Sequence, residues 1–91
     1  MDISYDPAKD ARNVARRGIS FARAADFDWP SALIVEDKRW DYGEQRYQAL
    51  GFIDERVYAL VFTPRAGRIH VISLRKANSR EVRRYETQTE S

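Results

Sequence analysis

The spacing of apolar residues changes near residue 31, and the two spacings predict different elements. From Ala8 to Ala15, apolar residues recur every three or four positions, which is typical of one face of a helix. Asp6-Pro7 provides an N-cap with proline at the first helical position, and Gly18 stands where a helix commonly ends. We therefore predict a first helix between Asp6 and Gly18.

Shorter elements are predicted on both sides of this helix. Ile3 and Tyr5 alternate with polar neighbours, as in a short edge strand. Ser20 can cap a second, short helix, which Asp28-Trp29-Pro30 must end because proline disfavours helical backbone in the residue before it.

Four segments of the second part of the chain have the β-branched or alternating composition of strands: 31–37, 45–53, 57–63 and 68–76. Segment 57–63 is apolar on both faces, so we expect it at the centre of the sheet. The short connections 54–56 and 64–67 favour antiparallel pairing of successive strands.

Strict alternation along 68–76 divides the last strand into two faces. It places Ile69, Val71, Ser73 and Arg75 on one face and Arg68, His70, Ile72, Leu74 and Lys76 on the other. Arg75 is then held at the rim of a packed strand, where a fixed cation can stabilise a developing negative charge. Alternatively, Arg75 pairs with Glu81 or Glu44.

Asn78 and Glu81 have the spacing of a capping box, so we expect a last helix from about residue 79. Val82 and Tyr85 share one face of it, whereas Arg80 and Arg84 lie one turn apart and repel, which a nearby anion would relieve. The predicted fold is an α+β domain spanning residues 1–91, with an antiparallel sheet of three to four strands, two N-terminal helices and a C-terminal helix.

The positive charge is concentrated in the second half of the chain. Residues 1–45 carry seven Lys/Arg against nine Asp/Glu, and residues 46–91 carry nine against five. Thirteen of the sixteen cations are arginine, whose planar fork suits phosphate contact. A solvated surface is the alternative interpretation.

Several classes of protein are excluded or disfavoured by composition. The absence of cysteine and a single histidine argue against a transition-metal site or a thiol nucleophile, and no metal or other cofactor is expected. The longest apolar run, Val57 to Phe62, is far too short to span a bilayer. The acidic N-terminus lacks the pattern of a secretory signal, so we expect a cytoplasmic location.

Few side chains are candidates for chemistry. Glu44 and Arg46 lie on the same strand face, where they could serve a phosphate site or simply neutralise each other. His70 is the residue with an ordinary pKa near neutrality, but a lone strand histidine is more often structural. Tyr85 could donate a hydrogen bond, stack on a base, or anchor the core.

Cationic and aromatic residues lie close together between Lys38 and Tyr42, a mixture that suits single-stranded RNA and also a protein interface. The residues that we expect to contact RNA are Lys38, Arg39, Arg68, His70 and Lys76.

Three spaced motifs resemble those of the BrnT family, the toxins of BrnT/BrnA toxin–antitoxin pairs. The first comprises Tyr5-Asp6, Lys9, Asn13, Gly18-Ile19-Ser20-Phe21 and Ala24; the second Gly43-Glu44, Arg46 and Gly51; the third Arg68-Ile69 and Ser73-Leu74-Arg75-Lys76-Ala77. The chain departs from the signature at Arg16-Arg17, where the family usually has Lys-His, at Tyr5, which replaces Trp, and at Leu74, which replaces Ala.

The resemblance implies a RelE-like fold and a metal-independent endoribonuclease that cleaves mRNA and inhibits translation. It also implies inhibition by a BrnA-like antitoxin, whose ribbon-helix-helix domain binds operator DNA. By motif, Arg75 would stabilise the phosphate, and Glu44 and Arg46 would act in or support the active site, with Tyr85 matched loosely. The alternative is a noncatalytic module that binds an antitoxin or RNA through its arginines.

Overall fold

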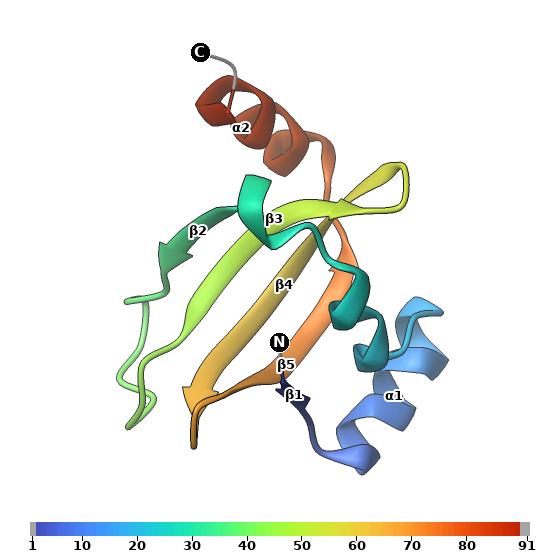
Figure 1. Cartoon of the computed structure of the whole chain (residues 1–91), viewed down its shortest axis with the longest axis vertical. Helices are drawn as coiled ribbons and strands as arrows, with labels where there is room; N and C mark the ends of the chain where they lie inside the picture. The colour runs from blue at the N-terminus through green and yellow to red at the C-terminus, as the bar shows by residue number, and fades with distance from the viewer. Residues whose placement is uncertain (1, 90–91) are drawn as a thin grey trace.

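The computed structural model describes residues 2–89, which form an α+β fold, as predicted (Figure 1). Its elements are β1 (Ile3–Ser4), α1 (Pro7–Arg17), the 3₁₀ helices η1 (Phe21–Asp26) and η2 (Trp29–Ser31), β2 (Leu33–Glu36), β3 (Tyr47–Ile53), β4 (Arg56–Arg65), β5 (Arg68–Lys76) and α2 (Ser79–Thr89). Within these residues, neither α-helix has the length and apolar content needed to cross a membrane.

The sheet is larger than predicted and mixed. Its five strands are ordered β1-β5-β4-β3-β2, which confirms the central place of β4. Strands β2 to β5 are antiparallel neighbours, but β1 pairs parallel to β5 through Ile3 and Ser4. The four antiparallel strands β2 to β5 and the short edge strand at the N-terminus agree with the prediction. The parallel pairing of β1, which makes the sheet mixed, was not predicted, because it joins segments far apart in sequence and leaves no local turn signal.

The two predicted N-terminal helices are both present as α1 and η1, and the structure adds the short η2. Asp6 caps α1 by accepting a hydrogen bond from Ala8 N at 2.9 Å, and Gly18 ends it in the left-handed conformation. The second, short helix has a capping Ser20, as expected, and is the 3₁₀ helix η1. Its i→i+3 hydrogen bonds, such as Arg23 N to Ser20 O, are typical of short helical segments, and η1 has six residues.

A bulge in β5 overturns the alternation predicted for that strand. Val61 of β4 pairs with Ser73 of β5, but the next residue of β4, Phe62, pairs with Val71. Ile72 therefore has no partner in β4. The extra residue reverses the pattern of faces. Val71 and Leu74 therefore enter the same core, whereas Arg75 lies on the other face of the sheet.

The two faces of the sheet are covered unequally. One face carries the larger core, in which Phe21, Ala24 and Phe27 of the η1 region pack on Leu60 and its neighbours. In Figure 1 the 3₁₀ segments lie across this face. The opposite face carries a smaller core under α2, formed by Leu50, Val57, Ala59 and Tyr85. Helix α2 thus covers one end of that face.

The start of α2 confirms the capping box. Asn78 Oδ1 accepts from Glu81 N at 2.8 Å, and Glu81 Oε1 accepts from Asn78 N at 3.0 Å. Ala77 and Val82, on either side of this cap, both pack against the smaller core.

The Asn13 side chain connects α1 to the sheet. Its amide donates to Ile19 O at 2.9 Å and to Leu74 O at 2.8 Å. One residue of α1 thereby holds both the segment after the helix and the outer edge of β5.

Replacing Asn13 should loosen this connection. We expect Asn13→Ala to lower the free energy of unfolding by about 2 kcal/mol, since two hydrogen bonds are lost and two carbonyls lose their donor. Urea unfolding measures the change, with Arg12→Ala on the same helix as the control. A loss no larger than that of the control would show that these hydrogen bonds contribute little.

Candidate functional site

A cleft of about 350 Å³ lies on the open part of the sheet face that carries α2. We call it the sheet cleft; it is lined by Val35, Glu36, Asp37, Lys38, Arg39, Gln48, Arg75, Asn78, Arg80, Glu81 and Arg84. These residues come from β2 and the connection that follows it, from β3, from the end of β5 and from α2. Five are cations and three are carboxylates, so the lining is net positive.

The register of the sheet explains where the cleft begins. Arg75 of β5 pairs with Ala59 of β4, which pairs with Leu50 of β3, and Ala59 and Leu50 pack in the smaller core under α2. In the next row, Val35 pairs with Gln48, and the Val35 side chain is half exposed. The cleft therefore starts where the apolar contact with α2 stops.

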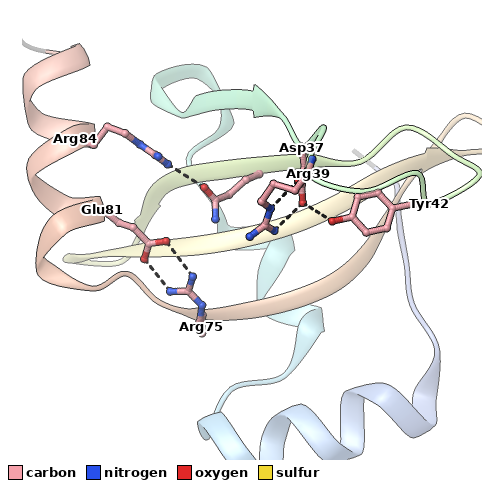
Figure 2. A network of polar contacts seen from close by, with 7 residues as sticks. Asp37, Arg39, Tyr42, Arg75, Glu81 and Arg84 are labelled. Atoms are coloured by element: carbon pink, nitrogen blue, oxygen red, sulfur yellow. Dashed lines mark hydrogen bonds and ion pairs between the residues drawn. The ribbon is translucent and has the colours of Figure 1, made fainter.

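Arg75 is held rigidly at the cleft wall by Glu81. Its Nη1 and Nη2 atoms donate to the two Glu81 carboxylate oxygens at 2.8 and 2.9 Å (Figure 2). Nη1 also donates to Lys76 O at 3.3 Å. A guanidinium has five N–H donors, so Nε–H and one Nη2 hydrogen, on the same edge, have no acceptor within residues 2–89. That edge has the geometry for two phosphate oxygens.

The opposite wall is organised by Asp37. Its carboxylate accepts from Arg39 Nε and Nη2 at 2.9 and 2.8 Å and from the Tyr42 hydroxyl at 3.0 Å (Figure 2). The Asp37 side chain is only 6% exposed. The hydrogen bonds from Arg39 hold the pKa of this carboxyl well below its ordinary value, although burial opposes the shift. Asp37 thus fixes the connection between β2 and β3 through hydrogen bonds to two of its residues.

Helix α2 contributes two more cations that the candidate residues from sequence did not include. Arg84 donates to Gln48 Oε1 at 2.9 Å across the cleft, and Arg80 lines it one turn earlier. Neither makes an ion pair with any of residues 2–89. In the sequence, the one-turn spacing of these two arginines, at which like charges repel, was the feature that indicated an anion site.

Glu44 and Arg46, expected to act in or support the same active site as Arg75, lie elsewhere on this side of the sheet. Glu44 pairs with Arg65 at 3.0 Å and more loosely with Arg46 at 3.6 Å. The Arg46 guanidinium also stacks 4.0 Å from the centre of the Tyr42 ring. Glu44 lines a neighbouring hollow, and neither residue lines the sheet cleft. Each of the two predicted arginines is thus bound to its own acidic neighbour.

Tyr85 lies inside the smaller core rather than in the cleft. It is 6% exposed, its ring meets Phe52 edge-on, and its hydroxyl is 3.5 Å from Ser31 Oγ. This placement matches the alternative interpretation of Tyr85 as a core anchor.

The residues expected to contact RNA divide into two groups. Lys38 and Arg39 line the cleft with Arg75, whereas Arg68, His70 and Lys76 do not. His70 Nδ1 lies 2.9 Å from Ser4 Oγ at the β1 edge, and burial, followed by the charge of Arg65, lowers the pKa of His70. The side chain of Lys76, next to Arg75 in β5, points to the opposite face.

The Arg75–Glu81 pair should make stability depend on pH. Hydrogen bonds from Arg75 hold the pKa of Glu81 below its ordinary 4.5. The stabilisation is therefore complete above about pH 4.5 and is lost as the pH falls through the folded-state pKa. At neutral pH we expect Glu81→Gln to reduce the free energy of unfolding by about 2 kcal/mol, and the difference from the native protein should shrink in acid.

Urea unfolding of both proteins across this pH range provides the measurement. Glu86→Gln, an exposed change on the same helix, is the control. An equal deficit of Glu81→Gln at neutral and acidic pH would contradict the ion-pair origin of the stability.

Comparison with known proteins identifies the family. No curated protein matches the sequence significantly. Residues 5–81 match the family model described as the ribonuclease toxin BrnT of a type II toxin–antitoxin system, and the match contains the connection after β2, all of β5 and the start of α2. Since it covers most of the chain, the protein belongs to the BrnT family of type II ribonuclease toxins.

Proposed function

We propose that the protein is a metal-independent endoribonuclease that cleaves mRNA and thereby inhibits translation, with the sheet cleft as its active site. The observation that carries the proposal is the convergence of five cations on one cleft: Lys38, Arg39, Arg75, Arg80 and Arg84. They come from three separate parts of the chain, the connection after β2, the end of β5 and α2, so the fold rather than a local run of charge brings them together. Membership of a ribonuclease toxin family supports the same activity, and a RelE-like relationship of the fold is part of the proposal.

The reaction is an internal transesterification of RNA. A ribose 2′-oxygen attacks the adjacent phosphorus, the bond from phosphorus to the 5′-oxygen breaks, and the products are a 2′,3′-cyclic phosphate and a 5′-hydroxyl. Negative charge increases on the phosphate oxygens in the transition state. The free edge of Arg75 would bind these oxygens, and because Glu81 already fixes the guanidinium, little reorganisation is needed.

Charge stabilisation and orientation would supply most of the rate enhancement. The one histidine of the sequence, His70, lies outside the cleft. Of the three carboxylates that line it, Asp37 and Glu81 have a pKa that arginine holds below its ordinary value, so both are weak proton acceptors, and the third, Glu36, is exposed at the end of β2. The guanidinium groups of the cleft cannot lose a proton in a protein, so they supply positive charge and not proton transfer.

Glu44 and Arg46 act as supporting residues in this proposal. A chain of contacts runs from Glu44 to Arg46, to Tyr42, to Asp37 and on to Arg39. These contacts hold the connection that presents Lys38 and Arg39 to the cleft. Tyr85 has no part in the chemistry and instead anchors α2 to the sheet.

The type II family implies an antitoxin partner and an RNA substrate. We further propose that the antitoxin is of the BrnA type, with a ribbon-helix-helix domain, and that operator DNA is reached only through it. Acting on mRNA would place the protein in the cytoplasm.

Removing the proposed phosphate-binding group should abolish activity. Purified Arg75→Ala, incubated with labelled RNA in EDTA, should cleave about 10²- to 10³-fold more slowly than the native protein. Expression of the variant should no longer arrest growth. Arg83→Ala, which removes an exposed cation of α2 outside the cleft, should cleave normally.

Urea unfolding of Arg75→Ala separates loss of chemistry from loss of fold, since Glu81 also loses its partner in this variant. Cleavage by Arg75→Ala at the native rate would refute the assignment of Arg75. If the native protein binds the RNA in EDTA but yields no cyclic phosphate, the noncatalytic binding module is correct instead.

A further inference from the structure

A second cationic hollow lies on the other side of β5, between that strand and α1. It has a volume of about 360 Å³, and we call it the α1 groove. Its lining comprises Lys9, Arg12, Asn13, Arg16, Arg17, Phe21, Ile72, Ser73, Leu74 and Arg75. Five of these residues are cations and none is a carboxylate, in contrast to the sheet cleft.

The groove follows from the shortness of β1. This strand pairs only with Ile69 and His70, so β1 does not reach the rest of the outer edge of β5. Helix α1 lies beside that edge (Figure 1). Lys9, Arg12 and Arg16 recur at three- and four-residue spacing and therefore form one stripe along the helix.

The charge of the stripe is not neutralised by its neighbours. Lys9, Arg12, Arg16 and Arg17 make no ion pair with any side chain of the described part of the chain. Asp10, on the same helix, accepts hydrogen bonds from Phe21 N at 2.7 Å and from Ser20 Oγ at 3.2 Å. Its carboxylate therefore binds the segment after α1 and does not line the groove. The cationic lining of the α1 groove thus favours an anion.

We propose that the α1 groove binds the phosphate backbone of the RNA strand that occupies the sheet cleft, outside the cleaved nucleotides. Arg75 lines both hollows, so they meet at this residue near the end of β5. This inference rests on the proposed ribonuclease function and adds a second binding surface to it. Arg16 and Arg17 would then act by holding phosphate.

Contacts in the groove favour an RNA backbone over an added peptide strand or stacked bases. A peptide strand added to β5 would need the Leu74 carbonyl, but Asn13 already donates to it and α1 blocks the approach. Recognition of bases is also disfavoured, since Phe21, the aromatic residue in the lining, is 1% exposed and offers no face for stacking. We therefore expect binding without sequence preference.

The test compares two pairs of arginines that remove equal charge. One variant carries Arg12→Gln and Arg16→Gln; the control carries Arg56→Gln and Arg83→Gln, exposed residues that line neither hollow. The probes are fluorescent 2′-O-methyl RNAs of about four and about sixteen nucleotides, the range of typical single-strand sites. Because the methylated 2′-oxygen cannot attack, fluorescence anisotropy measures binding whether or not the protein cleaves RNA.

For the longer RNA, the groove variant should bind about twentyfold more weakly at 0.1 M salt, with a salt slope reduced by about 1.4. The short RNA should bind both variants alike. An equal loss in the control pair, an equal loss with the short RNA, or unchanged binding of the longer RNA would each overturn the proposal. Reduced binding of an oligoglutamate peptide with unchanged RNA affinity would instead assign the groove to an acidic protein.

The outcome is independent of the cleavage assay. Failure to form cyclic phosphate in EDTA refutes the ribonuclease chemistry and leaves the binding result intact. Unchanged affinity of the Arg12 and Arg16 variant refutes the groove alone.

Discussion

Unequal cover of the two sheet faces is the constraint on which the site depends. The η1 region fills one face with a core that includes Phe21, Leu60 and Leu74. On the other face, α2 contributes a smaller core around Tyr85 and covers only one end. The remaining surface cannot be apolar without exposing a large hydrophobic patch, so polar and charged side chains occupy it. The open half of that face is the sheet cleft.

Ion pairs in the cleft hold the cations in place and partly neutralise them. Glu81 caps α2, binds both terminal nitrogens of Arg75 and thus links the helix to the last strand. Asp37 has the same relation to Arg39 and the connection after β2. Such pairing restricts the side chains of both arginines before any ligand arrives, which lowers the ordering cost on binding. Arg80 and Arg84, without acidic partners among residues 2–89, supply the remaining positive charge.

Local patterns predicted the elements well and their mutual placement poorly. The cap of α1, the central β4, the bounds of β5 and the capping box of α2 all follow from nearby residues, and each is confirmed. The bulge at Ile72 is different, because no residue near it signals an insertion. It arises where Val71 and Leu74 must both face one core, and that requirement belongs to the packed sheet.

The candidate site shows the same division. Sequence alone determined that Arg75 ends a core strand, that Glu81 is one of two possible partners, and that Lys38 and Arg39 follow a strand beside aromatic residues. Only the tertiary structure decided that Arg75 meets Lys38 and Arg84 rather than Arg46, and that Tyr85 is buried. Hydrogen bonds and periodicity act within a few residues and can be inferred from spacing. Which side chains share a cleft depends on strand register and on where a helix stops covering the sheet, and both are settled by contacts between distant segments.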